Sequence, residues 1–136
     1  MSIKHILFVC VENSCRSQIA QAFANIHGEG RGENNKVAAH SSGSRPSGVV
    51  NPKAIQSMRA LNYDLSQHQS KSLEEIPAIE YEYAITMGCG DECPLVNAKH
   101  RDDWAITDPK HMNPDEFNQV RDEIEQRVIA LLESID

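Results

Sequence analysis

The segment Cys10–Ser17 constrains the fold of this chain more than any other part of the sequence. It follows a nearly continuous apolar run from Ile3 to Val9, which is typical of a strand buried on both faces. It leads into Arg16–His27, where apolar residues recur at helical spacing. A short loop between a buried strand and a helix directs backbone N–H groups and the positive end of the helix dipole toward one point. The sequence therefore predicts a site for a tetrahedral oxyanion.

The side chains of this loop suit the same chemistry. Cys10 begins the loop, where positive potential favours the nucleophilic thiolate. Arg16 is placed to donate from both arms of its guanidinium to an anion, and Ser17 to hydrogen-bond the thiolate. Asn13 tolerates the left-handed backbone of a tight turn, and we expect Cys15 to pack beneath the loop. The expected oxyanion-binding residues are Val11, Glu12, Asn13, Ser14, Cys15, Arg16 and Ser17.

Beyond this loop the pattern alternates between strands and helices. Further strands are expected at Val37–Ser42, Glu82–Met87 and Asp103–Ile106, and helices at Lys53–Leu61, Ser72–Ile76 and Pro114–Ile135. This alternation predicts one α/β domain over residues 1–136, a three-layer fold with a four-stranded parallel sheet flanked by helices on both faces. Ligands of such sheets bind beyond the carboxyl ends of the strands. We expect Cys10–Ser17, Gly88–Pro94 and the segment around Asp108 to meet there.

Charge and composition exclude several classes of function. The net charge of −7 argues against general binding to nucleic acid or to anionic membranes, so the positive potential of an anion site must be local. No apolar run approaches the roughly 20 residues of a transmembrane helix. The apolar N-terminal stretch lacks a cleavage site and is interpreted as a strand, so a cytoplasmic location is expected. The four cysteines are then expected to be reactive thiols rather than structural disulfides.

The loop carries a resemblance to a known family. Cys10–Ser17 resembles the Cys-x4-Cys-Arg-Ser loop of low-molecular-weight protein tyrosine phosphatases, and Asp108-Pro109 resembles the general-acid loop of that fold. The resemblance covers nearly the whole chain. It implies that Cys10 attacks a tetrahedral oxyanion and that Asp108 protonates the departing oxygen. Arsenate reductases share this loop, so these motifs by themselves do not choose between hydrolysis and reduction.

Two further cysteines favour reduction. Cys89 and Cys93 lie in a Gly-rich segment that resembles the redox loop of the phosphatase-like arsenate reductases, and Trp104 extends this resemblance. A phosphatase hydrolyses its thiophosphate with water, whereas a reductase needs additional thiols to resolve the sulfur–arsenic adduct. Phosphatases also usually carry an aromatic residue where Lys110 stands here.

The resemblance thus implies an arsenate reductase whose catalytic residues are Cys10, Arg16, Asp108, Cys89 and Cys93. In this hypothesis Cys10 attacks arsenate and a thiol–disulfide relay through Cys89 and Cys93 follows. The alternative is a phosphatase that hydrolyses phosphate monoesters through a Cys10 thiophosphate. A non-catalytic oxyanion-binding module is a further alternative, and it would need no reactive Cys10.

The expected partners follow from this chemistry. Arsenate is the expected substrate, with phosphate or sulfate as mimics, and thioredoxin is the expected reductant, with glutaredoxin as the second choice. We expect no tightly bound cofactor and no metal. A zinc site built from Cys89, Cys93, His100 and His111 is a weaker alternative, because the spacing of these residues is loose.

Overall fold

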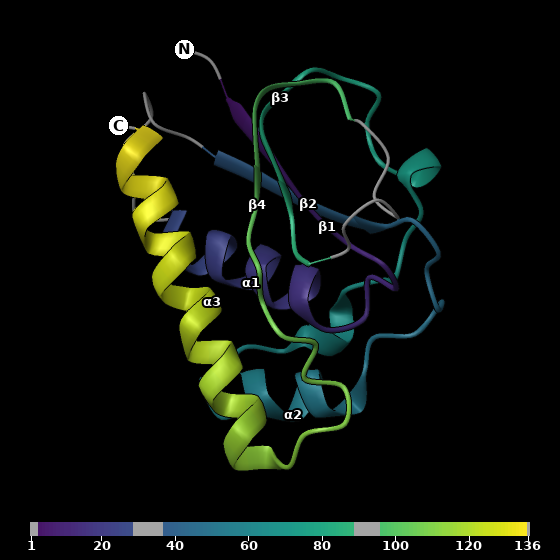
Figure 1. Cartoon of the computed structure of the whole chain (residues 1–136), viewed down its shortest axis with the longest axis vertical. Helices are drawn as coiled ribbons and strands as arrows, with labels where there is room; N and C mark the ends of the chain where they lie inside the picture. The colour runs from purple at the N-terminus through teal and green to yellow at the C-terminus, as the bar shows by residue number, and fades with distance from the viewer. Residues whose placement is uncertain (1–2, 29–36, 89–95, 136) are drawn as a thin grey trace.

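The computed structural model describes residues 3–28, 37–88 and 96–135 and contains a four-stranded, all-parallel sheet (Figure 1). The strands are β1 (Lys4–Cys10), β2 (Val37–Gly43), β3 (Tyr81–Thr86) and β4 (Ala98–Asp103), arranged in the order β2-β1-β3-β4. β1 is therefore central, and residues Ile6 to Val9 are fully buried. Burial on both faces explains why its sequence is apolar without alternation.

In the part of the chain that the structure describes, three α-helices accompany the sheet, and two short 3-10 helices lie between α2 and β3. Their bounds are α1 (Arg16–Gly28), α2 (Pro52–Arg59), η2 (Leu65–Gln67), η3 (Leu73–Glu75) and α3 (Pro114–Ile135). α2 begins where it does because Asn51 Oδ1 accepts the N–H of Lys53 at 2.9 Å, and Pro52 supplies a backbone already set for a first turn. Among the described residues, no helix is both long and apolar enough to cross a membrane.

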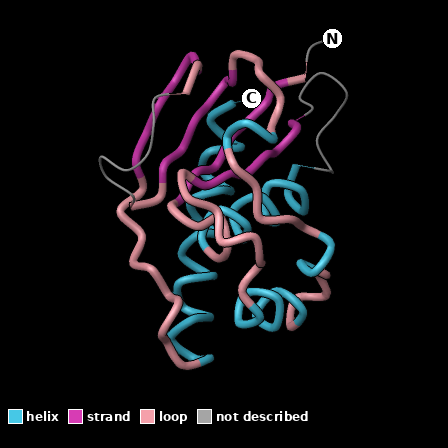
Figure 2. Tube along the Cα trace, turned by 90° about the vertical axis from the view of Figure 1, so that its right-hand side faces the viewer, coloured by secondary structure: helices cyan, strands magenta, loops and turns pink. Residues whose placement is uncertain are grey.

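Different elements cover the two faces of the sheet, and Figure 2 shows the helices in cyan against the strands in magenta. On one face, Phe8 and Ile85 pack in the main core with Phe23 of α1 and Ile124 of α3. On the other face a smaller cluster forms around Leu7, Val9 and Tyr81, beneath partly buried residues of η3 and the segment that follows it. The three layers are thus the α-helices, the sheet, and a thinner layer that contains a 3-10 helix.

The structure confirms the predicted fold class and corrects the fourth strand. That strand was expected at Asp103–Ile106 but spans Ala98–Asp103. All of its residues after Ala98 are exposed, because β4 is an edge strand that pairs only with β3 among the described strands. An exposed edge needs no apolar pattern, so neither periodicity nor hydrophobicity marked it. Trp104 and Ile106 lie beyond the strand and are buried in the main core.

The strand register brings the expected loops to one edge of the sheet. Cys10 pairs with Gly43, Val9 pairs with Thr86, and Thr86 pairs with Asp103. The carboxyl ends of β1, β3 and β4 therefore lie side by side. The loop after β1 and the segment after β4 leave the sheet at the same edge, as expected for a parallel α/β fold.

Candidate active site

The loop between β1 and α1, here called the anion loop (residues 10–17), is held in shape from behind. Asn13 has the positive φ of 50° that a tight turn requires. Its Nδ2 donates to Ser17 Oγ at 2.8 Å, and its Oδ1 accepts from Gln18 Nε2 at 2.8 Å and from the backbone N–H of Lys71 at 2.8 Å. Asn13 and Ser17 are fully buried. Their side chains therefore fix the loop and do not face its outer side.

The end of β2 lies against the outside of the anion loop. A Cβ on Gly43 would be 2.6 Å from the carbonyl oxygen of Val11 and 2.9 Å from the amide nitrogen of Asn13. Only glycine permits this close approach of two backbones. Arg45 then donates its N–H to the carbonyl oxygen of Val11 at 2.8 Å. The conformation of the anion loop therefore depends on the neighbouring strand as well as on its own residues.

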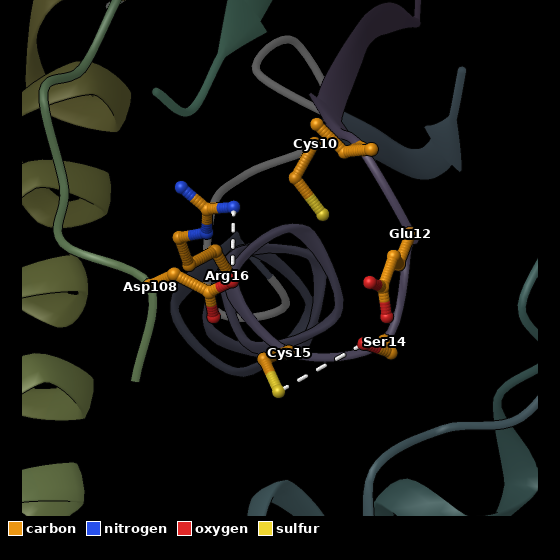
Figure 3. Close-up of a pocket in the computed structure, with 7 residues that line it drawn as sticks. Cys10, Glu12, Ser14, Cys15, Arg16 and Asp108 are labelled. Atoms are coloured by element: carbon orange, nitrogen blue, oxygen red, sulfur yellow. Dashed lines mark hydrogen bonds and ion pairs between the residues drawn. The ribbon is translucent and has the colours of Figure 1, made fainter. Parts of the chain in front are cut away.

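Cys10 lines a cavity of about 180 Å³ that lies over the anion loop (Figure 3). Its Sγ is 2.8 Å from Ser17 Oγ, the contact expected from the sequence, and the residue is only 3% exposed. The other lining residues are Val11, Glu12, Ser14, Cys15, Arg16 and Asp108. Sites for organic ligands usually measure about 300–1,000 Å³. This cavity suits a small inorganic oxyanion placed against the sulfur.

Arg16 is anchored by the segments that follow β3 and β4. Its Nη1 donates to the carbonyl oxygen of Met87 at 2.6 Å and to that of Ile106 at 3.1 Å. Its Nη2 lies 3.8 Å from Asp108 Oδ2 (Figure 3). Only 10% of the side chain is exposed, so these acceptors compensate a charge that has lost most of its water. These contacts hold the guanidinium in a fixed position at the cavity.

Gly88 makes room for this arrangement. It has a φ of +80°, and a Cβ there would lie 2.9 Å from Arg16 Nη1 and 3.0 Å from the carbonyl oxygen of Ile106. Glycine therefore serves both a left-handed turn and a close contact with the guanidinium. The sequence identified Gly88 only as part of a Gly-rich loop. Its contact with a residue 72 positions earlier had no signal in the sequence.

The segment around Asp108, here called the acid loop (residues 107–112), is tied to two other elements. The Asp108 side chain is 50% exposed at the rim of the cavity, and its Oδ1 accepts the N–H of Lys110 at 3.1 Å. Lys110 Nζ donates to Glu12 Oε2 at 2.9 Å. Lys53 Nζ, from α2, donates to the carbonyl oxygens of Lys110 at 3.1 Å and Met112 at 3.0 Å. The role of Lys53 was missed, because no local motif links α2 to this loop.

Cys15 differs from Cys10. Burial raises the pKa of its thiol to about 11, and the negative charges of Asp108 and Cys10 add to this, whereas hydrogen bonds with Ser14 and Asn51 act in the opposite direction. The residue is 3% exposed and lines the cavity (Figure 3). A thiol with such a pKa is neutral near pH 7, so it adds no negative charge beside a bound anion.

The expected redox pair, Cys89 and Cys93, lies outside the described residues, as does most of the loop Gly88–Pro94. The zinc alternative includes both cysteines. In the ranges 3–28, 37–88 and 96–135, no group of three or more His, Cys, Asp or Glu residues is arranged to hold a metal. His100, on β4, stacks instead on Tyr83 with ring centroids 4.8 Å apart.

Comparison with known proteins agrees with this geometry. The family model for low molecular weight phosphotyrosine protein phosphatase matches residues 5–136. The glutaredoxin arsenate reductase of Synechocystis sp. is 35% identical over 98% of this chain and 99% of its own. A solved arsenate reductase in its phosphate-binding state superposes with a TM-score of 0.85 and 35% identity, again over 98% and 99% of the two chains.

A thioredoxin-dependent arsenate reductase of Corynebacterium glutamicum superposes with a TM-score of 0.74 and 30% identity, over 98% of this chain and 62% of its own. The family match therefore extends through the anion loop, the acid loop and the last helix. The chain belongs to the low molecular weight phosphotyrosine protein phosphatase family.

Proposed function

We propose that this protein reduces arsenate to arsenite with Cys10 as the nucleophile. The observation that carries the proposal is the cavity itself, in which Cys10, the anchored Arg16 and Asp108 surround a space of inorganic-oxyanion size. The names of the relatives support arsenate as the oxyanion, because the Synechocystis protein and the superposed structures are arsenate reductases matching nearly the whole chain.

The first step is nucleophilic attack. The Cys10 thiolate, which Ser17 Oγ approaches to 2.8 Å, forms a bond to arsenic. Arg16 and the N–H groups of the anion loop hold the arsenate oxygens, as a helix N-terminus does for other oxyanions. Asp108 gives a proton to the departing oxygen, which leaves as water. The product is an arsenic(V) adduct on the Cys10 sulfur.

Reduction follows by thiol exchange. The Cys89 thiolate attacks the Cys10 sulfur, and the electron pair of the sulfur–arsenic bond passes to arsenic, which leaves as arsenite. The Cys93 thiolate then attacks Cys89, which releases Cys10 and forms the Cys89–Cys93 disulfide. The two electrons that arsenic gains are those lost when the two thiols become one disulfide. Arg16 and Asp108 are free for the next cycle.

An external dithiol resets the disulfide, and thioredoxin remains our prediction. Relatives with each donor are known, since the Synechocystis relative carries glutaredoxin in its name and the Corynebacterium one is thioredoxin-dependent. No tightly bound cofactor is required by these steps. A relay of free thiols operates in a reducing compartment, so we place the protein in the cytoplasm.

The proposal is tested by arsenate-dependent oxidation of NADPH, measured with the complete thioredoxin system and, in parallel, with glutaredoxin and glutathione. We expect turnover with one of them and an arsenite product. Cys89→Ser is expected to stop turnover while Cys10 still reacts once with arsenate. Cys93→Ser is expected to stop one step later, with a Cys10–Cys89 disulfide that peptide mass spectrometry detects.

The phosphatase alternative is tested in the same preparation with p-nitrophenyl phosphate. Rapid hydrolysis without arsenate-dependent NADPH oxidation would replace the proposed reductase by a phosphatase. Normal steady-state reduction by Cys89→Ser would contradict the relay but not the role of Cys10. The two results separate the choice of substrate from the route of the electrons.

A further inference from the structure

An ion pair crosses the rim of the candidate active site. Lys110 Nζ donates to Glu12 Oε2 at 2.9 Å, and the two side chains are 40% and 39% exposed. Glu12 belongs to the anion loop and lines the cavity, whereas Lys110 belongs to the acid loop. An exposed ion pair of this kind contributes little to stability. Its position, which links the two loops that form the site, indicates a role in ligand access.

The side of the rim on which Lys110 lies is the side where a leaving group departs. A general acid protonates the oxygen that leaves, so the organic part of an ester, attached to that oxygen, must pass beside Asp108. The N–H of Lys110 donates to Asp108 Oδ1 at 3.1 Å, which places Lys110 at this exit. Figure 3 shows Glu12 and Asp108 on opposite sides of the pocket. The Lys110 side chain reaches from the Asp108 side to Glu12.

Charge gives the pair a second effect. The Glu12 carboxylate lines a cavity suited to an oxyanion, where an uncompensated negative charge would repel the guest. Lys110 neutralises it. The hydrogen bond and charge of Glu12 also raise the pKa of the Lys110 ammonium above its usual value, so Lys110 stays charged at neutral pH. The ion pair can therefore cross the rim of the cavity without repelling an anion bound inside it.

We propose that the Glu12–Lys110 pair is a specificity-determining strap that closes the site to phosphate and arsenate esters and leaves it open to free oxyanions. The inference deepens the proposed function, on which it rests, by naming the substrate class. A free arsenate loses only water, which needs no wide exit. An ester would have to displace the strap, because its organic group occupies the position where the Lys110 side chain crosses.

The strap is tested by protection of Cys10 against iodoacetamide, followed by peptide mass spectrometry. Inorganic phosphate and phenyl phosphate are the two protecting ligands, and the quantity measured is the ratio of their half-protecting concentrations. In the wild type we expect phenyl phosphate to need at least about tenfold more than phosphate. The double variant Glu12→Ala/Lys110→Ala removes the strap without changing net charge. It is expected to narrow that ratio about two- to fivefold, mainly through better protection by phenyl phosphate, because an exposed ion pair costs little to displace.

The matched control is Glu82→Ala/Lys99→Ala, which removes a 3.6 Å ion pair of the same residue types at the start of β3 and β4. It should leave both concentrations unchanged. A single variant, Lys110→Met, leaves Glu12 uncompensated and is expected to weaken protection by phosphate about three- to tenfold. The proposed strap would be refuted if the ratio of half-protecting concentrations were unchanged in Glu12→Ala/Lys110→Ala. It would also be refuted if the ratio changed equally in the control variant.

The assay reads binding alone, so it separates the strap from the reductase proposal. Equal protection by the two ligands in the wild type would refute the strap and leave arsenate reduction standing. A wild type that excludes phenyl phosphate but shows no arsenate-dependent NADPH oxidation would refute the reductase proposal and leave selection for free oxyanions standing.

Discussion

A methyl group added at Gly88 would meet the guanidinium of Arg16. The new Cβ in Gly88→Ala would lie 2.9 Å from Arg16 Nη1 and 3.0 Å from the carbonyl oxygen of Ile106. Either the guanidinium or the backbone must shift, and with it the bonds that Nη1 makes to Met87 and Ile106. The residue must also keep a φ of +80°, which costs an L-residue about 1–2 kcal/mol.

The magnitude follows from the hydrogen bonds at risk. A hydrogen bond to a charged group contributes roughly 1.5–3 kcal/mol, and 1.4 kcal/mol corresponds to a tenfold change in binding. Loss of one such bond between a displaced Arg16 and the oxyanion weakens phosphate binding about 10- to 100-fold. The assay is protection of Cys10 from alkylation by phosphate, together with urea unfolding for stability.

Gly48→Ala is the matched control. Gly48 has almost the same φ, +84°, but nothing lies within 4 Å of an added Cβ. Both variants should lose about 1–2 kcal/mol of unfolding free energy through the backbone. Only Gly88→Ala should lose phosphate binding. Equal phosphate binding by Gly88→Ala and Gly48→Ala would refute the view that Gly88 is required to seat Arg16.

Three further predictions concern Cys15, Lys53 and Ser17. Between pH 9 and 11 the unfolded thiol of Cys15 ionises while the folded one, with its pKa raised from 9.0 to about 11, stays protonated. The free energy of unfolding should therefore fall by about 2–3 kcal/mol over that range. Urea unfolding of Cys15→Ala should show a fall that is smaller by this amount, and an equal fall in the variant and the wild type would contradict the prediction. Lys53→Met removes the two bonds to carbonyl oxygens of the acid loop and should lower kcat for arsenate several-fold, less than the loss of a buried charged bond because both bonds are exposed, while Lys99→Met should not. Unchanged kcat would show that α2 does not position the acid loop. Ser17→Ala removes the 2.8 Å contact to Cys10 Sγ and should slow alkylation of Cys10 at pH 7 about tenfold. An unaltered rate would show that this contact does not activate the Cys10 thiol.

The parts of the fold that sequence reasoning found are those in which burial imposes a pattern. β1 is apolar because it is covered on both faces, and α3 spans Pro114–Ile135, the predicted range, because one face of it packs in the main core. The fourth strand was misplaced because all of its residues after Ala98 are exposed, so its pairing with β3 leaves no apolar pattern in the sequence. A periodic pattern of apolar residues indicates which residues are buried, so it cannot identify an exposed edge strand.

The residues of the candidate site also fall into those that the sequence identified and those that it did not. Cys10, Arg16 and Asp108 were identified because their chemistry is written in short motifs, and the structure places all three at one cavity. Gly88 and Lys53 act on residues distant in the chain, through contacts that exist only after folding. No spacing rule within a single sequence connects such pairs.

The exposed charges of β4 have a consequence for how copies of this protein behave in concentrated solution. An edge strand offers unpaired N–H and C=O groups to which a strand of another molecule can add. Lys99, His100, Arg101 and Asp102 occupy successive positions along this edge, all of them exposed. A second chain that paired there would bring charged side chains into register and strip them of water. The same charged residues that left no apolar pattern in the sequence of β4 therefore disfavour strand addition at this edge of the described sheet.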